Sequence, residues 1–300
     1  KRLMNLKKFY LTNTERVRIL FSLLVNTLSK YRSFNILKRN LQTCLVNEKR
    51  NPLTNKPLAN KNEYLLLWNN EKRKIYPAVD SYLNQLNANV PKEWIHALAL
   101  PTQVSIKTSG VNYQHGFVLF KTLVDYLERS QLGIINILEI GTAKGFSCLC
   151  MAKVFEDLGV KGTIRTIDIL PHEIPLYWNS ISDIKGKISR VDLLNAYENL
   201  TTKFIQFIHG KSQEILPQLH PERIHFAFID GEHFYENVIF DGEFIAKRQK
   251  TGDLLVFDDY NTSLFPGVVK AADEICLKNN YSKTIINSNE QRGYLIAQKQ

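Results

Sequence analysis

The chain has 300 residues, which is more than one small hydrophobic core needs. Hydrophobic residues make up 44% of it and aromatic residues 11%, and this composition argues against a disordered protein. Its net charge of +10 is concentrated in residues 1–100, where 18 Lys and Arg face 6 Asp and Glu, whereas residues 101–300 carry 21 against 23. Such a basic region can bind nucleic acid, anionic lipid or an acidic glycan, but a helical surface exposed to solvent is the simpler interpretation.

The cysteines indicate neither a disulfide framework nor a zinc site. The chain has four of them and no C-x-x-C pair, so a reducing cytoplasm is the expected compartment. The most apolar N-terminal stretch, residues 17–28, is interrupted by Arg18 and Asn26. It is shorter than the ~20 apolar residues of a spanning helix, and no small-residue cleavage site follows it. Neither a transmembrane segment nor a signal peptide is therefore expected.

The N-terminal third is predicted to be a helical region that precedes a second domain of different organisation. Apolar residues at helical spacing predict helices before residue 130 over 14–46, 63–86, 94–98 and 115–129. An Asn-, Lys- and Pro-rich stretch at 47–61 is typical of a linker. We therefore expect a basic helical region over residues 1–105 and a second domain over 106–300.

From residue 134 onward, short apolar runs alternate with helical stretches. The runs are nearly continuous in Ile, Leu, Val and Phe, which is typical of strands buried on both faces. The expected strands are 134–140, 163–169, 204–208, 224–229, 254–257, 282–287 and 293–298. The expected helices are 146–158, 191–200, 212–216, 234–248 and 266–277. This alternation predicts an α/β fold, a doubly wound Rossmann-like sheet of seven mostly parallel strands with a terminal antiparallel hairpin.

A glycine-rich turn follows the first strand of this sheet. The strand ends near Glu139, and the turn contains Gly141, Ala143 and Gly145 before the next helix. Glycine lets the backbone turn tightly and approach a ligand at the positive end of that helix. Many nucleotide-binding folds share such a turn, but the pattern is not G-x-G-x-x-G and lacks the Gly-Lys-Ser/Thr of a phosphate-binding loop.

Two further strand ends carry candidate cofactor contacts. Asp168 ends the second strand, 27 residues after Gly141, where an acidic side chain can accept both ribose hydroxyls of an adenosine. Its position behind a glycine-rich turn favours this over a simple strand cap. Gly210, Lys211 and Ser212 follow the third strand and could border an adenine ring, although a turn with a helix cap at Ser212 explains them equally well.

The strongest group of candidate functional residues is acidic. Asp230 and His233 follow the fourth strand, and Asp258 and Asp259 follow the fifth. The carboxyl ends of neighbouring parallel strands meet at one edge, and three carboxylates there repel unless a cation joins them or one is protonated. Oxygen ligands suit Mg²⁺, and an imidazole with an ordinary pKa of ~6.5 suits a general base. Solvated aspartates and a surface histidine are the competing interpretation.

Residues 110–300 resemble class I S-adenosylmethionine (SAM)-dependent methyltransferases. The resemblance is carried by Glu139-Ile-Gly-Thr-Ala-Lys-Gly145, Ile229-Asp-Gly-Glu-His233 and Phe257-Asp-Asp-Tyr260. These motifs are most similar to those of Mg²⁺-dependent sugar O-methyltransferases related to macrocin O-methyltransferase, and more distantly to catechol-type enzymes. Many members have Gly where this chain has Ala143.

The resemblance implies a role for each candidate residue. The resemblance implies that Glu139, Gly141, Gly145 and Asp168 bind the cofactor. Their positions in the motifs and at the strand ends add Ala143, Gly210, Lys211, Ser212 and Asp230 to the expected cofactor-binding residues. The implied metal ligands are Asp230, Asp258 and Asp259, with His233 as general base. The expected reaction is methyl transfer from SAM to a hydroxyl of a small molecule, a sugar or glycan being the expected class, with Mg²⁺.

Three other functions agree less well with these motifs. An RNA methyltransferase could grip RNA with the basic region, but no Asn-Pro-Pro-Tyr motif or known RNA module is present, so nucleic acid is disfavoured. A non-enzymatic SAM-fold scaffold conflicts with the intact acidic set, and an NAD-dependent oxidoreductase with the absent G-x-G-x-x-G. The aromatic segment 170–190 suits a lid over a ring, while a structural insertion or a dimer contact, and hence a homo-oligomer, is the alternative.

Overall fold

The computed structural model describes residues 54–86, 89–130, 132–221, 223–289 and 292–300. One compact unit spans Leu53–Gln300. The helix predicted over 14–46 lies outside the described residues. Among the described helices, none combines the length and hydropathy that crossing a bilayer requires. Cys148, Cys150 and Cys276 are buried and not in disulfides.

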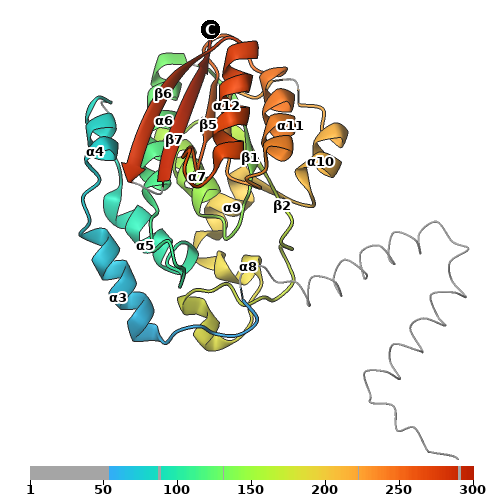
Figure 1. Ribbon diagram of the computed structural model, residues 1–300. Helices are drawn as coiled ribbons and strands as arrows, with labels where there is room; N and C mark the ends of the chain where they lie inside the picture. The colour runs from blue at the N-terminus through green and yellow to red at the C-terminus, as the bar shows by residue number, and fades with distance from the viewer. Residues whose placement is uncertain (1–53, 87–88, 131, 222, 290–291) are drawn as a thin grey trace, which may run out of the picture. The chain divides into compact units, whose positions relative to one another are not determined.

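Seven strands form one sheet in the order β3-β2-β1-β4-β5-β7-β6 (Figure 1). They are β1 (Ile134–Ile140), β2 (Lys161–Asp168), β3 (Ile205–His209), β4 (Phe226–Ile229), β5 (Leu254–Phe257), β6 (Tyr281–Asn289) and β7 (Arg292–Lys299). The first five strands pair in parallel, and β7 pairs antiparallel with both β5 and β6. The predicted Rossmann-like sheet with its terminal hairpin is confirmed.

Helices cover both faces of the sheet. They are α6 (Gln114–Ser130), α7 (Phe146–Leu158), α8 (Arg190–Leu193), α9 (Glu198–Phe204), α10 (Ser212–Ile215), α11 (Tyr235–Ala246) and α12 (Pro266–Lys278). In β4, Phe226 and Phe228 belong to the core that contains α6 and α7, whereas Ala227 and Ile229 belong to the core that contains α11 and α12. Because both faces of the strand are covered, both alternating sets must be apolar, which explains the continuous apolar runs.

From β1 the chain adds strands towards one edge of the sheet, and from β4 it adds them towards the other edge. The topological switch point therefore lies between β1 and β4. Ile140 of β1 pairs with Ile167 on one side and with Ile229 on the other, and Ile229 pairs with Phe257 of β5. The residues that follow these strands therefore emerge at the same edge of the sheet. In open α/β sheets, ligands bind at this carboxyl edge, beside the switch point.

The helix predicted over 63–86 is two helices, α3 (Lys61–Lys72) and α4 (Pro77–Asn84). Pro77 occupies the first turn of α4. Proline fits a first helical turn but disfavours helical geometry at the residue before it, so the chain cannot run helically through Tyr76. The helix α3 begins at a capping box in which Asn60 and Glu63 each accept from the other's backbone N–H.

The helices α3, α4 and α5 (Lys92–Thr102) share a core with α6 and α7. Tyr64, Val79 and Ile95, one from each helix, are completely buried in it. Residues 54–105 of the predicted N-terminal region thus pack on the predicted catalytic domain. Whether residues 106–300 fold without them stays a prediction, which deletion can test.

Deletion of residues 1–53 is expected to leave a cooperatively unfolding protein, whereas deletion of residues 1–105 is expected to lower its stability severely. The longer deletion removes several fully buried side chains, and the loss of one such side chain typically costs about 2–5 kcal/mol. Thermal unfolding of the two fragments, followed by circular dichroism, measures the difference. A cooperative transition of unchanged midpoint in residues 106–300 would instead support the boundary at 105.

Candidate active site

The glycine-rich turn after β1 is shaped by two glycines with positive φ. Gly141 has φ +100°, and a Cβ there would lie 2.0 Å from the carbonyl oxygen of Asp230. Gly145 has φ +87°, and its Cβ would lie 2.7 Å from Leu194 Cδ1. Any side chain at either position would meet both backbone strain and a steric clash. The turn therefore lies directly against the loop that follows β4.

Asp168 ties the turn to the end of β2. One carboxylate oxygen accepts from the backbone N–H of Ala143 at 2.6 Å, and the other accepts from that of Leu170 at 2.6 Å. The hydrogen bond helps to hold Ala143 at φ +44°, a conformation uncommon for a residue with a side chain. Each oxygen keeps a second acceptor position, so Asp168 can still accept from a ribose.

Arg190 also holds this turn, and its role was not apparent from the sequence. The side chain is 2% exposed. Its Nε donates to the carbonyl of Ala143 at 2.9 Å, and its Nη2 lies 3.7 Å from Asp168 Oδ1. The residue lies 22 positions beyond Asp168, in a segment without a recognised motif, so only the folded chain reveals the contact.

Glu139 is completely buried beneath the turn. Thr166 donates to one of its carboxylate oxygens, and the Ser147 hydroxyl lies near the carboxylate, while the other oxygen accepts no well-aligned hydrogen bond in the described structure. Burial raises the pKa of Glu139 to about 7. A buried acceptor without a partner is costly and suits a donor group of a ligand, such as the ammonium of a methionine moiety. Together with the space at Gly141 that a Cβ would fill, it fits a bound SAM.

Glu139→Gln is expected to reduce the dependence of stability on pH. The folded-state pKa of about 7 exceeds the ordinary 4.5, so the folded protein binds this proton more tightly than the unfolded chain. The stability that this group contributes is therefore complete below pH 4.5 and is lost as the pH rises to about 7. Urea unfolding at pH 5 and pH 8 should show a smaller loss in the variant. Equal losses in both proteins would mean that Glu139 is already ionised.

The residues after β3 form a turn beside the end of β2. The N–H of Gly210 donates to the carbonyl of Asp168 at 2.8 Å. Lys211, rather than Ser212, occupies the N-cap of α10, and it makes no side-chain cap bond. Ser212 is the buried first residue of that helix. The structure thus brings Gly210 next to Asp168, and the contact with an adenine ring stays a prediction.

Part of the segment after β2 is anchored in the core, while residues 181–188 help to line a pocket of about 520 Å³. Trp178 is completely buried, and its indole N–H donates to the carbonyl of Ile188 at 2.8 Å. The side-chain amide of Asn179 accepts from the backbone N–H of Ile106 and donates to the backbone carbonyl of Ile106, each at 2.9 Å. The turn residue Lys144 donates to Ser105 Oγ at 2.5 Å. These contacts hold the chain around residue 105 beside the glycine-rich turn, and the choice between a lid and a structural insertion stays a prediction.

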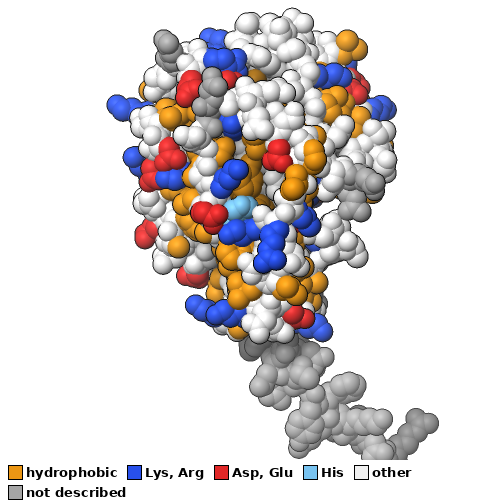
Figure 2. Space-filling model, turned by 90° about the vertical axis from the view of Figure 1, so that its left-hand side faces the viewer, with side chains coloured by type: hydrophobic (Ala, Val, Ile, Leu, Met, Phe, Trp, Pro, Cys, Tyr) orange, Lys and Arg blue, Asp and Glu red, His pale blue; other side chains and the backbone are white. Residues whose placement is uncertain are grey.

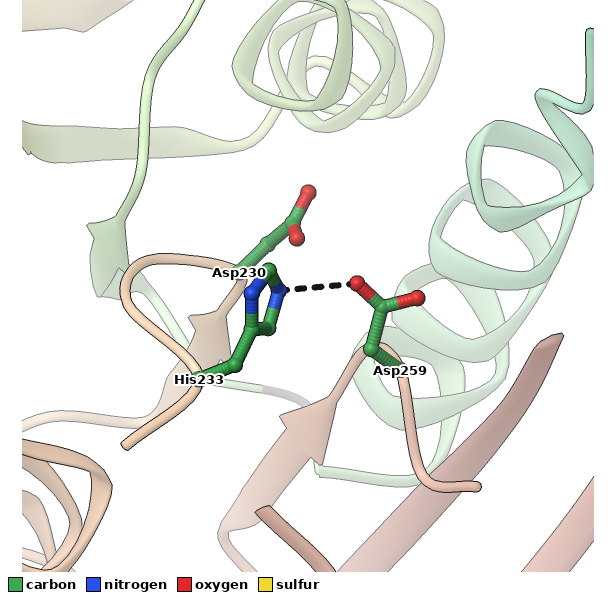
Figure 3. A group of neighbouring side chains, drawn as sticks. All are labelled: Asp230, His233 and Asp259. Atoms are coloured by element: carbon green, nitrogen blue, oxygen red, sulfur yellow. Dashed lines mark ion pairs between the residues drawn. The ribbon is translucent and has the colours of Figure 1, made fainter. Parts of the chain in front are cut away.

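Asp230, His233 and Asp259 converge at the ends of β4 and β5. Each offers one possible ligand atom, and these atoms lie within 4.8 Å of one another. His233 Nε2 lies 2.9 Å from Asp259 Oδ2, and Figure 3 shows the Asp230 carboxylate above the imidazole, near the ion pair of His233 with Asp259. The His233 side chain is 43% exposed, so it is open to a ligand. Two carboxylates and an imidazole form a donor set that fits a divalent cation.

Asp258 lies outside this group and pairs with Arg292 instead. One oxygen of Asp258 accepts from the N–H of Asp259 at 2.7 Å, and the other lies 3.2 Å from Arg292 Nη1. Arg292 Nε also lies 3.5 Å from Asp259 Oδ1. Arg292 was not singled out from the sequence, because its position depends on the register of the terminal hairpin. The backbone N–H of Tyr260 donates to the carbonyl of Gly293. This hydrogen bond places the neighbouring residue Arg292 beside Asp258 and Asp259.

Arg292 and Lys107 offset only part of the repulsion among the three aspartates. Burial, together with Asp258 and Asp259, raises the pKa of Asp230 well above its ordinary range. Burial raises the pKa of Asp258 to about 6 against the lowering effect of Arg292. Burial also tends to raise the pKa of Asp259, but the hydrogen bond from His233 and the charge of Arg292 outweigh it and lower that pKa. A cation beside Asp230 would relieve this repulsion.

Comparisons with known proteins agree with this architecture. Residues 138–260 match the family model of a methyltransferase domain. The fold resembles the O-methyltransferase NovP, with 15% identity over 74% of this chain and 99% of that chain, at a TM-score of 0.52. An O-methyltransferase from Bacillus cereus in complex with SAH is 18% identical over 75% and 98% of the two chains, at a TM-score of 0.47. No curated protein sequence matches the chain.

Proposed function

We propose that this chain, which has the fold of class I SAM-dependent methyltransferases and a methyltransferase domain at residues 138–260, methylates a hydroxyl oxygen with a divalent cation. The supporting observation is that the Asp230–His233–Asp259 group adjoins the glycine-rich turn. Gly141 and Asp230 are close enough that a Cβ would collide with the Asp230 carbonyl. A cofactor on the turn and an acceptor at the acidic group would therefore be neighbours.

The residues of the turn would hold the cofactor. The unpartnered oxygen of Glu139 suits the ammonium of SAM, and the remaining acceptor positions of Asp168 suit its ribose. Bound SAM would supply a methyl group on a positively charged sulfur, which a nucleophilic oxygen can attack directly. The chain then contributes mainly by positioning the two reactants, which can supply a large part of a rate enhancement.

His233 and Asp259 would act as an oriented base. Because Asp259 is a carboxylate 2.9 Å from Nε2, it selects the tautomer with its proton on Nε2. That tautomer leaves Nδ1 free to accept the proton of the acceptor hydroxyl. Asp259 would also stabilise the imidazolium that results, as the carboxylate of a catalytic triad does.

Asp230 and Asp259 would hold the divalent cation. Such a cation would lower the pKa of an acceptor hydroxyl. Asp258 and Arg292 would position Asp259 without binding the cation. Asp258 accepts a hydrogen bond from the backbone N–H of Asp259, and Arg292 contacts both Asp258 and Asp259. Two vicinal hydroxyls suit such a site, which is why a sugar is our proposed class of acceptor.

The first test is cofactor binding and turnover with the full chain. Calorimetry is expected to show binding of SAM and of S-adenosylhomocysteine but not of NAD. Incubation with SAM, Mg²⁺ and pools of hydroxyl-bearing acceptors is then expected to release S-adenosylhomocysteine. Tight binding of NAD without any SAM signal would overturn the proposed cofactor, and release with amine acceptors alone would overturn transfer to oxygen.

A further inference from the structure

A polar pocket lies among α3, α4, α5 and α6 and shares no lining residue with the candidate active site. Its volume is about 350 Å³, within the ~300–1,000 Å³ typical of small-molecule sites. Figure 2 views the molecule from the side on which α3, α4 and α5 lie in Figure 1, and several Lys and Arg side chains gather near the centre of that face. The pocket is lined among others by Lys72, Lys74, Lys92, His96, Gln114 and Lys121.

The lining carries more positive than negative charge. Four lysines face it against two carboxylates, those of Glu71 and Asp80. Lys74 pairs with Glu71 at 2.6 Å, and Lys72 pairs at 3.0 Å with Glu93. Glu93 does not line the pocket, and its side chain is 83% exposed. Two of the lysines are thus paired, and Lys92 and Lys121 remain against the single carboxylate of Asp80, so the pocket keeps an excess of positive charge.

Lys92 and Lys121 form no ion pair in the part of the chain that the structure describes. Lys121 is buried, and its Nζ donates only to a backbone carbonyl, that of Leu83. Burial and the neighbouring Lys92 both lower the pKa of Lys121, and burial and Lys72 lower that of His96. The cations therefore lie close enough to repel one another, and an anion between them would relieve this.

Two helices begin at the pocket. Lys92 is the first residue of α5 and Gln114 is the first residue of α6, and both line it. The backbone N–H of Lys92 donates to the carbonyl of Val90, and that of Gln114 donates to the side chain of Asn112. These helix starts therefore contribute the partial positive charge of their dipoles, which favours an anion. Gln114, Phe117 and Lys121 are spaced by three and four residues, so they lie on one face of α6. The amide, the helix start and the ammonium can thus face the same ligand.

We propose that this pocket binds the phosphate group of a small molecule. Lys92 and Lys121 supply positive charge that exceeds that of the Asp80 carboxylate, and the oxygens of a phosphate can accept from several donors at once. The ligand is either free inorganic phosphate or a phosphate ester, such as a phosphorylated methyl acceptor. This binding is independent of the proposed methyl transfer and goes beyond it.

Calorimetry with the full chain, without SAM and at low salt, tests this proposal. The probes are inorganic phosphate, glucose 6-phosphate and, as a neutral control, glucose. Phosphate or its ester is expected to bind, and glucose is not. Lys92→Gln and Lys121→Met should each weaken binding about tenfold or more, because each removes a charged contact. Methionine keeps the buried stem of Lys121, and a thermal melt checks that both variants fold.

Lys161→Gln is the matched control, since Lys161 is an exposed lysine at the start of β2 that does not line the pocket. It should bind as the wild type does. Equal affinity for the two phosphate probes would identify the free ion as the ligand, and tighter binding of glucose 6-phosphate would identify an ester. Failure of both probes to bind, or equal losses in Lys92→Gln and Lys161→Gln, would overturn the proposal while leaving methyl transfer untouched.

Discussion

Replacement of His233 by alanine is expected to lower turnover by about 10²–10⁴-fold, the usual effect of losing a general base. The side chain is exposed, and its only described polar contact is with Asp259, so the fold should survive the change. Initial rates with a verified acceptor, at saturating SAM and Mg²⁺, measure the effect. His220→Ala removes another exposed histidine that lies outside the site and should leave the rate unchanged.

The same variant separates a base from a metal ligand. If His233 is the base, the Mg²⁺ concentration needed for half-maximal rate should stay near that of the wild type, and only the maximal rate should fall. A strongly raised Mg²⁺ requirement would instead make His233 a ligand, as its place in the group with Asp230 and Asp259 allows. Dialysis against EDTA should abolish wild-type activity, and Mg²⁺ should restore it. Full activity in a metal-free assay would rule out the cation and keep the fold assignment.

Gly141→Ala is expected to abolish SAM binding and to destabilise the protein by more than the backbone strain alone. A left-handed conformation costs a residue with a side chain roughly 1–2 kcal/mol. At Gly141 the added Cβ would also lie 2.0 Å from the Asp230 carbonyl, so the backbone of the β4 loop must move. Thermal unfolding and SAM calorimetry measure the two effects.

Gly186→Ala is the matched control for this change. Gly186 has the same φ of +100°, but an added Cβ there would meet nothing within 4 Å. The difference between the two variants therefore isolates the clash from the strain. If both lose the same stability and Gly141→Ala still binds SAM, the close approach of the turn to the β4 loop does not shape the cofactor site.

Local patterns in the sequence were sufficient to predict the strands of the sheet. The apolar run at Leu254–Phe257 predicted β5 with the bounds that the structure has, and the run at Ile134–Ile140 did the same for β1. Strands covered on both faces must be apolar throughout, so their signal is strong and local. The glycines of the turn were equally visible, because few other residues accept a positive φ.

The partners of the acidic residues could not be predicted in the same way. The sequence grouped Asp258 with Asp230 and Asp259, but the structure pairs Asp258 with Arg292, 34 positions away. That pairing depends on where the terminal hairpin docks against β5. The roles of Arg190 and Asn179 are likewise set by contacts between segments that no local pattern connects.

The sequence by itself determined which residues end the parallel strands, and hence that Glu139, Asp168 and Asp230 gather at one edge. This follows because parallel strands present their carboxyl ends on the same side of a sheet. The tertiary structure alone decided which charges neutralise one another there and which helices complete the core. Those outcomes depend on packing between distant segments, where a shift of one residue in register exchanges the side chains that meet.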